Sequence, residues 1–281
     1  MADQVMRGSV ELDALKPELW SAAFFPTLLE TLPFNGVVAR DYEGDIRALG
    51  DTVNITEFPQ FDEAEEIQED QKVDADSITA SNQQLVINKQ VVKDYIVTDR
   101  AKVQTIEHAN ALRDLAFHSI FKKMQSILIA ATVPSAAAPD HQIPYDAGST
   151  LALADMLEAK ELLDTQNVPD DGSRQMILDS PQWNDIFNIT GFTSRDFIPT
   201  GSPLSTGALP AQVLGFNPKF TTEASAVAYF FHPMYMNMAV QKMLDVKEFD
   251  QGVEGKRSVR INSTILFGVK QTSDIRVVTI S

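Results

Sequence analysis

The chain has 281 residues, with 23 Lys and Arg against 39 Asp and Glu, a formal net charge of −16 at pH 7, and no cysteine. The lack of cysteine excludes disulfide bonds, a thiolate nucleophile and cysteine-ligated zinc or iron–sulfur sites. The excess of acidic residues argues against sequence-specific nucleic-acid binding, which gains affinity from Lys and Arg placed against phosphates. An acidic wall that merely faces nucleic acid is compatible with this charge.

Hydrophobic residues make up 44% of the chain and charged residues 22%, which is typical of a folded soluble protein with a sizeable core. No apolar run approaches the length of a membrane-spanning helix. The first ten residues, MADQVMRGSV, lack the basic start and apolar stretch of a secretory signal. We therefore expect one or two folded domains that are made in the cytoplasm and do not enter a membrane.

Residues 1–40 are predicted to form an extended arm followed by a short helical piece. Pro17, Pro26 and Pro33 exclude a long helix here, because proline removes a backbone donor and restricts the residue before it. The arm carries large apolar side chains, namely Trp20, Phe24, Phe25, Leu28, Leu29 and Phe34. These side chains need cover, and both the body of the same chain and a neighbouring subunit remain open as the surface that supplies it.

Residues 41–55, DYEGDIRALGDTVNI, predict a change of direction followed by a strand. A charged turn surrounds Gly44, an amphipathic crossing occupies residues 46–49, and a second turn at Gly50 and Asp51 leads into the strand-like TVNI. The chain then makes an acidic excursion before residues 84–97, whose alternation and Val, Ile and Tyr content predict one returning strand. Such a long two-stranded projection suits a protein that reaches onto its neighbour.

The acidic excursion, residues 58–76, contains six carboxylates within nine positions. They are Asp62, Glu63, Glu65, Glu66, Glu69 and Asp70. A calcium-binding loop needs spaced oxygen ligands around a tight glycine turn, and this stretch has no glycine, so we expect no metal site. Two interpretations stay open: a solubilising loop, or a loop tip that meets basic groups on a partner.

A helix is predicted from about residue 101 to residue 133, after Asp99 and before Pro134. Apolar residues recur along it at spacings of three and four, which is the pattern of a helix with one buried face. They are Val103, Ile106, Ala109, Leu112, Leu115, Ala116, Ile120, Met124, Ile127, Leu128 and Ala131. At the rise of an α-helix this rod is roughly 40–45 Å long. A helix of that length can serve as the spine of a subunit.

The C-terminal half predicts mixed elements. A second helix should begin at an N-cap at Ser149 or Thr150 and end near residues 167–169. Its predicted buried face consists of Leu153, Met156, Leu157 and Leu163. RQMILDS predicts a buried strand, and Ser180 followed by Pro181 predicts the N-cap and first turn of another helix.

The remaining segments are predicted to be mainly strand. Residues 190–210 predict a loop, whereas VLGFNPKF and AVAYFFHPMYMNMAVQ are strand-like. Two β-rich pieces, residues 258–266 and 275–280, should be joined through a turn near Gly268. Helices and strands do not alternate regularly, so the predicted fold class is α+β.

Motifs of catalysis are missing from the sequence. It has no phosphate-binding loop, no dinucleotide fingerprint and no nucleophile elbow. The four histidines, His108, His118, His141 and His232, are scattered without metal-ligand spacing and are interpreted as structural. We therefore predict no enzyme, no catalytic residue, no metal site and no cofactor.

Three short phrases occur in chain order around the predicted long helix. They are R-D-Y-E-G … G-D-T-V … I at residues 40–55, V-P-D-D-G-S-R … S-P at residues 168–181, and L-G-F at residues 214–216. Together with the arm, the acidic excursion and the spine-length helix, they resemble the major capsid proteins of tailed bacteriophages, whose fold is named for phage Hong Kong 97. One departure is Ser173, which interrupts the Gly-Arg pair of that pattern.

The resemblance implies an α+β fold of the Hong Kong 97 type. Its parts would be an N-terminal arm (1–44), an extended loop (45–95), a peripheral domain with the spine helix (96–134), an axial domain (135–228), and return strands that complete both domains (229–281). The arm and the loop would lie on neighbouring subunits. The resulting candidates for inter-subunit contacts are Trp20, Phe24, Phe25, Asp62, Glu63, Glu65, Glu66, Glu69 and Asp70.

The implied function is a self-assembling major capsid protein that forms the icosahedral head around the double-stranded DNA genome of a phage. Its partners would be other copies of itself in hexamers and pentamers, a portal, a cement protein and DNA contacted non-specifically, with no membrane. Because the matching arm begins close to Met1, we expect the scaffold to be a separate chain. The protein would be synthesised and assembled in the cytoplasm of a bacterial host and would end in the virion capsid.

Three alternatives follow from the same observations. An encapsulin-type nanocompartment shell would share the fold and hold cargo enzymes instead of DNA. An acidic enzyme with an unrecognised carboxylate site would be a monomer or small oligomer with a pocket. A non-capsid adhesion module is the third alternative, and the predicted long helix fits it poorly.

Overall fold

The computed structural model describes residues 32–46, 50–58, 61, 64, 66, 79–98, 109–145, 150–189, 209–250 and 258–281. The helices in this part of the chain are α2 (Phe34–Val37), α3 (Glu43–Ile46), α5 (Ala109–Ala131), α6 (Leu153–Thr165), α7 (Ser180–Ile186) and the 3₁₀ turn η3 (Pro233–Tyr235). The strands are β1 (Thr52–Glu57), β2 (Ser81–Val86), β3 (Lys89–Thr98), β4 (Gln142–Ile143), β5 (Gln175–Leu178), β6 (Asn217–Phe220), β7 (Ala228–Phe231), β8 (Met236–Asp250), β9 (Ser258–Gln271) and β10 (Val277–Ile280). This mixture confirms the α+β class.

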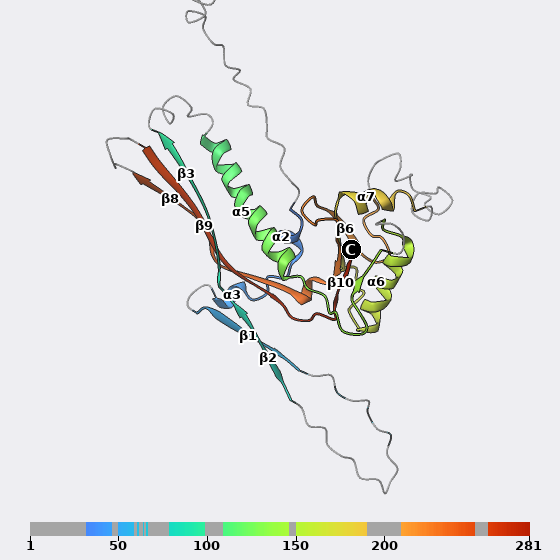
Figure 1. Cartoon of the computed structure of the whole chain (residues 1–281). Coiled ribbons are helices and arrows are strands. Elements are labelled where there is room, and N and C mark those ends of the chain that lie inside the picture. The colour runs from blue at the N-terminus through green and yellow to red at the C-terminus, as the bar shows by residue number, and fades with distance from the viewer. Residues whose placement is uncertain are drawn as a thin grey trace, which may run out of the picture.

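Three sheets organise the described residues (Figure 1). A five-stranded sheet in the order β4-β10-β7-β5-β6 lies with α6 and α7, and a three-stranded antiparallel sheet in the order β3-β9-β8 lies beside α5. The antiparallel pair β1-β2 extends away from both. The two-stranded projection expected from the sequence is thereby confirmed.

The five-stranded sheet is buried on both faces, because alternate residues of its strands enter two different cores. Met176 and Phe230 pack with α6 and α7, whereas Ile177 and Phe231 pack with α2 and α5. Phe34 of α2 stacks on Phe231, with ring centroids 5.8 Å apart. The second core also contains the inner face of the three-stranded sheet, so the two larger sheets are joined through α2 and α5.

Helix α5 confirms the predicted spine helix over the residues that the structure describes; the expected start near residue 101 lies outside them. Its buried hydrophobic residues stand at a spacing of four, which places them on one face. They are Ala116, Ile120, Met124 and Leu128. The end of the helix is closed by Thr132, whose hydroxyl donates to the Leu128 carbonyl at 2.9 Å.

The prediction of one strand over residues 84–97 is wrong. The segment divides at Ile87 and Asn88 into β2, which belongs to the projection, and β3, which pairs with β9. The predicted turn at Gly268 is also wrong, since Gly268 lies inside β9. A Cβ at this position would lie 2.4 Å from the Val86 carbonyl oxygen, so glycine is needed where the projection passes over the sheet.

The predicted start of the second helix is also wrong. Helix α6 begins at Leu153 after Ala152, and the Asp155 carboxylate accepts from the Ala152 backbone N–H at 2.9 Å. Met156 and Leu163 are buried as predicted, but Leu153 and Leu157 are exposed. The sheet covers a narrower stripe of α6 than the apolar pattern suggested.

Of the remaining predictions, one strand is confirmed, and one helix cap and two strand-like segments differ from the structure. The buried strand predicted in RQMILDS is confirmed as β5, whose four residues, Gln175–Leu178, are all buried. Helix α7 is capped one residue earlier than predicted, because the Asp179 carboxylate, instead of Ser180, accepts the first backbone N–H at 2.7 Å. In VLGFNPKF the strand is confined to β6. In the second strand-like segment, η3 separates β7 from β8.

Candidate subunit-contact surfaces

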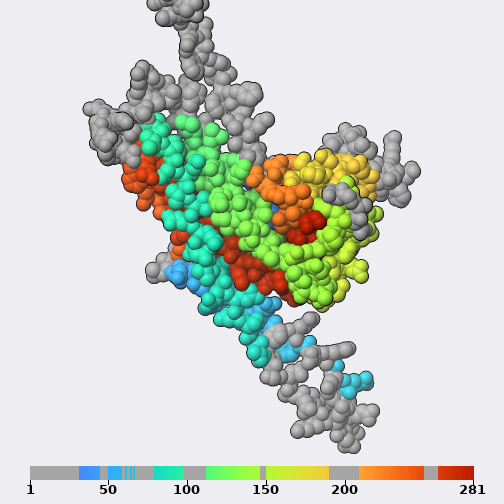
Figure 2. All heavy atoms as spheres, viewed as in Figure 1, coloured from blue at the N-terminus to red at the C-terminus, as the bar shows by residue number. Residues whose placement is uncertain are grey.

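The projecting hairpin β1-β2 is anchored at its base by backbone and side-chain contacts. The Ile87 N–H donates to the Asp51 carbonyl at 2.7 Å, and Gln241 of β8 donates to the Gly50 carbonyl at 2.7 Å. Leu85 and Ile87 are buried in a small cluster with Ala239 of β8. The base of the hairpin is therefore packed on the body, whereas the hairpin itself extends beyond it (Figure 2).

A polar clamp also fixes the hairpin to the segment between β9 and β10. The Gln83 amide donates to the Thr272 carbonyl at 2.7 Å and to the Glu57 carboxylate at 3.2 Å. The Arg276 guanidinium lies 3.6 Å from the same carboxylate and 4.9 Å from the centre of the Tyr235 ring. One donor from β2 and one cation from the body thus converge on Glu57 of β1.

Two phenylalanines stand at the outer end of the hairpin. Phe58 is 71% exposed and Phe61 is 67% exposed. Exposed apolar side chains that gather on a projection make it a candidate surface for a partner. The sequence prediction overlooked this pair, although F-P-Q-F inside an acidic stretch was the signal that could have revealed it.

Most of the contact candidates chosen from the sequence fall on residues outside the described ones. Glu66 is described and exposed. The others, Trp20, Phe24, Phe25, Asp62, Glu63, Glu65, Glu69 and Asp70, lie outside the described residues. Their roles therefore stay predictions.

The face of the three-stranded sheet that points away from α5 carries exposed apolar side chains beside a charged network. Ile96 and Phe249 are 60% and 50% exposed and stand opposite Arg260 in the register of the sheet. Arg260 pairs with Asp94, which also accepts from the Asn262 amide at 2.5 Å. The hydrogen bond from Arg260 is the main cause that lowers the pKa of Asp94. The sequence prediction missed this surface, because the face of each residue follows only from the register.

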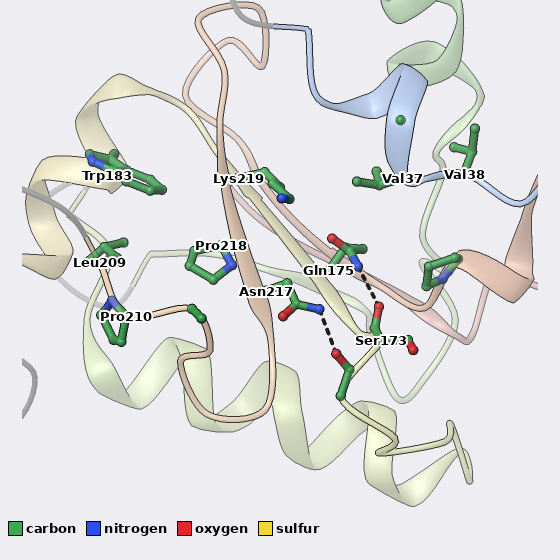
Figure 3. A pocket seen from close by; sticks show the side chains of 14 residues that line it. Val37, Val38, Ser173, Gln175, Trp183, Leu209, Pro210, Asn217, Pro218 and Lys219 are labelled. Atoms are coloured by element: carbon green, nitrogen blue, oxygen red, sulfur yellow. Dashed lines mark hydrogen bonds between the residues drawn. The ribbon is translucent and has the colours of Figure 1, made fainter.

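A groove of about 770 Å³ lies between α2 and the β6 edge of the five-stranded sheet (Figure 3). Val37 and Val38 form one wall, and Trp183, Leu209 and Pro210 lie at the other end. The floor includes side chains of β5 and β6 and the turn before β5.

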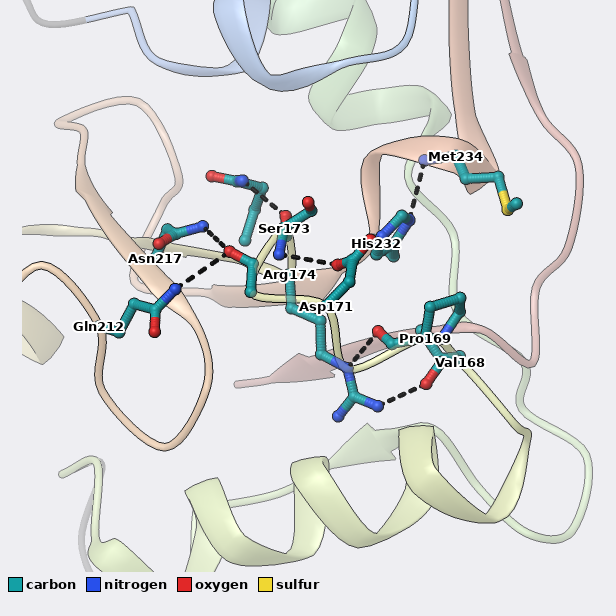
Figure 4. A network of polar contacts seen from close by, with 11 residues as sticks. Val168, Pro169, Asp171, Ser173, Arg174, Gln212, Asn217, His232 and Met234 are labelled. Atoms are coloured by element: carbon teal, nitrogen blue, oxygen red, sulfur yellow. Dashed lines mark hydrogen bonds and ion pairs between the residues drawn. The ribbon is translucent and has the colours of Figure 1, made fainter.

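A buried arginine holds the turn that borders this groove (Figure 4). The Arg174 side chain is 1% exposed and donates to the Val168 carbonyl at 2.5 Å and the Pro169 carbonyl at 2.9 Å. It also forms an ion pair with Asp164 of α6 at 2.7 Å. The V-P-x-x-G-S-R phrase is thus a helix-to-strand connection tied together by its own arginine.

The described residues contain no group of three or more His, Asp or Glu side chains placed to hold a metal ion. In the same part of the chain, no helix is both long and apolar enough to span a membrane.

Comparison with known proteins identifies this architecture. A family model described as phage capsid protein matches residues 99–281, so the chain belongs to the phage capsid protein family. Comparison with curated proteins found no match.

Solved phage structures share the fold over nearly the whole chain. A structure of Mycobacterium phage Che8 is 20% identical, with a TM-score of 0.76, and the match covers 95% of this chain and 97% of that one. The capsid structure of cyanophage P-SCSP1u is 11% identical, with a TM-score of 0.75 and coverage of 100% and 96%. The cyanophage Pam1 capsid asymmetric unit is 15% identical, with a TM-score of 0.72 and coverage of 100% and 98%.

The family and the fold confirm the resemblance that the sequence suggested. The chain is a structural protein, a major capsid protein that forms the phage head. The nanocompartment alternative is not favoured, because the matching family and the solved relatives described above are those of phages.

Proposed function

We propose that this chain assembles with copies of itself into hexamers and pentamers that close an icosahedral shell around double-stranded phage DNA. The observation that carries the proposal is the β1-β2 hairpin, which projects from the body with Phe58 and Phe61 exposed. Repeated head-to-tail contacts close into rings when the rotation between subunits allows it. The projection supplies a surface for such a contact.

The parts of the chain divide this work as follows. Residues 1–44 act as an arm and residues 45–95 as a loop, both lying on neighbours. Residues 96–134 form the peripheral domain with the spine helix, residues 135–228 the axial domain, and residues 229–281 complete the two. Trp20, Phe24 and Phe25 of the arm and the carboxylates of the loop (Asp62, Glu63, Glu65, Glu66, Glu69 and Asp70) make inter-subunit contacts.

Several partners follow from this role. Assembly takes place in the host cytoplasm with a separate scaffolding protein and a portal, and a cement protein reinforces the finished shell. The net charge of −16 supports loose, non-specific contact with packaged DNA, because an acidic wall does not bind phosphates tightly. The protein has no catalytic role and no cofactor.

The experiment that tests the proposal is nuclease protection. Particles that contain this chain are isolated from infected cells, treated with nuclease and then opened. We expect protected double-stranded DNA of uniform length. Particles that hold only protein would contradict the proposal and would support a nanocompartment instead.

A further inference from the structure

We infer that the groove between α2 and β6 is a docking site for residues 20–29 of a neighbouring copy of this chain. The inference rests on the proposed function, since it names where one end of the arm contact lies. Three properties of the groove support it: its unpaired acceptor, its edge strand and its charge.

The floor of the groove contains a buried hydrogen-bond acceptor without a donor. Gln175 of β5 is 9% exposed, and its Nε2 donates to the Ser173 carbonyl at 2.7 Å. The Oε1 of the same amide has no hydrogen-bond partner among the described residues. A buried acceptor left in this state is costly, so a donor from an incoming segment is favoured there. The indole N–H of Trp20 and the backbone N–H groups of the arm are donors of this kind.

The edge of the sheet favours docking by side chains over the addition of a strand. The backbone N–H groups of Asn217 in β6 and of Thr221, just after β6, donate to the carbonyls of Arg174 and Leu178 on the β5 side. Pro218 therefore faces the free edge, where it offers no N–H. An added strand would lose a ladder bond at this position. The proline rings and Trp183 instead present flat apolar walls that suit aromatic and Leu side chains.

Residues 20–29 match these walls in composition. They provide Trp20, Phe24, Phe25, Leu28 and Leu29, which must be covered. The acidic Glu18 and Glu30 flank this stretch, and the exposed Lys219 lies at the groove. Apolar side chains can thus fill the groove while a carboxylate meets the ammonium group.

The sequence next to α2 favours a neighbouring copy over the same chain as the source. Residues 27–32, TLLETL, lack Gly, Asn, Asp and Pro, the residues that reverse a chain most readily. Leu32 precedes Pro33, which disfavours helical backbone at Leu32. The stretch from Trp20 to Leu32 spans at most roughly 40 Å when extended, which is enough to leave the subunit.

The test uses the absence of native cysteine. One full-length chain carries Phe25→Cys, and a second, enlarged by a C-terminal tag, carries Ala211→Cys on the groove. The two are produced together, and the recovered particles are treated with a short bismaleimide. Ala154→Cys replaces Ala211→Cys as the matched control, since Ala154 is an exposed alanine on α6 and does not line the groove.

We expect the reagent to link the Phe25→Cys chain covalently to the tagged Ala211→Cys chain. We expect no such heterodimer when the tagged chain carries Ala154→Cys. Intact shells without that heterodimer would overturn the docking site and leave the capsid proposal standing. A double variant that carries Phe25→Cys and Ala211→Cys in one chain gives a further check. Links formed only within single chains would also overturn the docking site, because the occupant of the groove would then be the chain's own arm. If electron microscopy shows no shells of the parent protein even with its scaffolding partner, the proposed function fails and the docking site fails with it.

Discussion

The guanidinium of Arg174 lies 2.7 Å from the Asp164 carboxylate, and this ion pair joins the end of α6 to the start of β5. The two residues are ten positions apart and enclose the V-P-D-D-G-S phrase. Arg174 also stands 5.9 Å from the centre of the Phe216 ring, which belongs to the L-G-F phrase. One buried arginine therefore links two of the three phrases by which the sequence resembled a capsid protein.

Replacing Arg174 should destabilise the five-stranded sheet. Arg174→Met removes the donors to the Val168 and Pro169 carbonyls and should lower the free energy of unfolding by about 2–3 kcal/mol. Lys160→Met is the matched control, because Lys160 makes only partly exposed pairs and should cost less than about 1 kcal/mol. Urea unfolding of purified subunits measures both, and equal costs would contradict the role of Arg174.

The Asp164 pair also predicts a dependence of stability on pH. Burial opposes the shift, but the contacts with Arg174 and Lys160 lower the pKa of Asp164 below 3.8. The pair therefore stabilises the folded state above the unfolded-state pKa and loses this contribution as pH falls through the folded-state pKa. The difference in unfolding free energy between the parent and Asp164→Asn should stay constant near neutral pH and shrink below about pH 4. A difference that grows in acid would contradict this account.

Gly268 should resist substitution. Gly268→Ala places a Cβ 2.4 Å from the Val86 carbonyl and 3.0 Å from the Ile87 side chain, so the hairpin base must move away from β9. We expect a loss of about 1–3 kcal/mol in unfolding free energy. Gly44→Ala is the control, since nothing lies within 4 Å of a Cβ there. Similar unfolding free energies for the two variants would contradict the close contact between the hairpin base and Gly268 of β9.

The polar clamp should control local opening of the hairpin. Gln83→Ala removes the bonds to Thr272 and Glu57, each worth about 1 kcal/mol. Backbone amides of β1 and β2 should then exchange hydrogen about fivefold faster or more, while those of β5 stay unchanged. Gln84→Ala, on the neighbouring exposed position, is the control. Unchanged exchange in β1 and β2 would rule out the clamp.

Neutralising the acidic loop should affect assembly more than folding. A variant with Asn or Gln at all six carboxylates, residues 62, 63, 65, 66, 69 and 70, should give fewer shells and a weaker response of shell yield to salt. Its subunit unfolding free energy should match that of the parent, because surface charges contribute little to stability. If shell yield and its response to salt equal those of the parent, the acidic loop does not contribute to inter-subunit contacts.

The periodicity of α5 and the alternation in the hairpin were readable from the sequence, since both depend on regular local patterns. The errors arose where a tertiary contact overrides a local signal. Gly268 was interpreted as a turn because a sequence does not distinguish the glycine of a turn from one that permits a close backbone crossing. Asp155 and Asp179 accept the backbone N–H groups at the starts of α6 and α7, in place of the predicted capping residues. Several polar residues near each helix start can act as caps, so the sequence did not single out the right one.

The contact surfaces were less accessible to sequence reasoning than the fold. The acidic loop was conspicuous by composition, whereas Ile96, Arg260 and Phe249 come from three strands that only the sheet register brings together. The groove likewise collects residues from α2, α7, β5 and β6. No spacing in the sequence could have grouped them.

The most direct test of shell building is negative-stain electron microscopy of the purified protein, with light scattering on the same sample. The account predicts closed shells, or rings of five and six subunits, with masses that are multiples of the 31.1 kDa chain. A uniform 31.1 kDa species that stays unassembled under crowding, at high salt and with its scaffolding partner would contradict it.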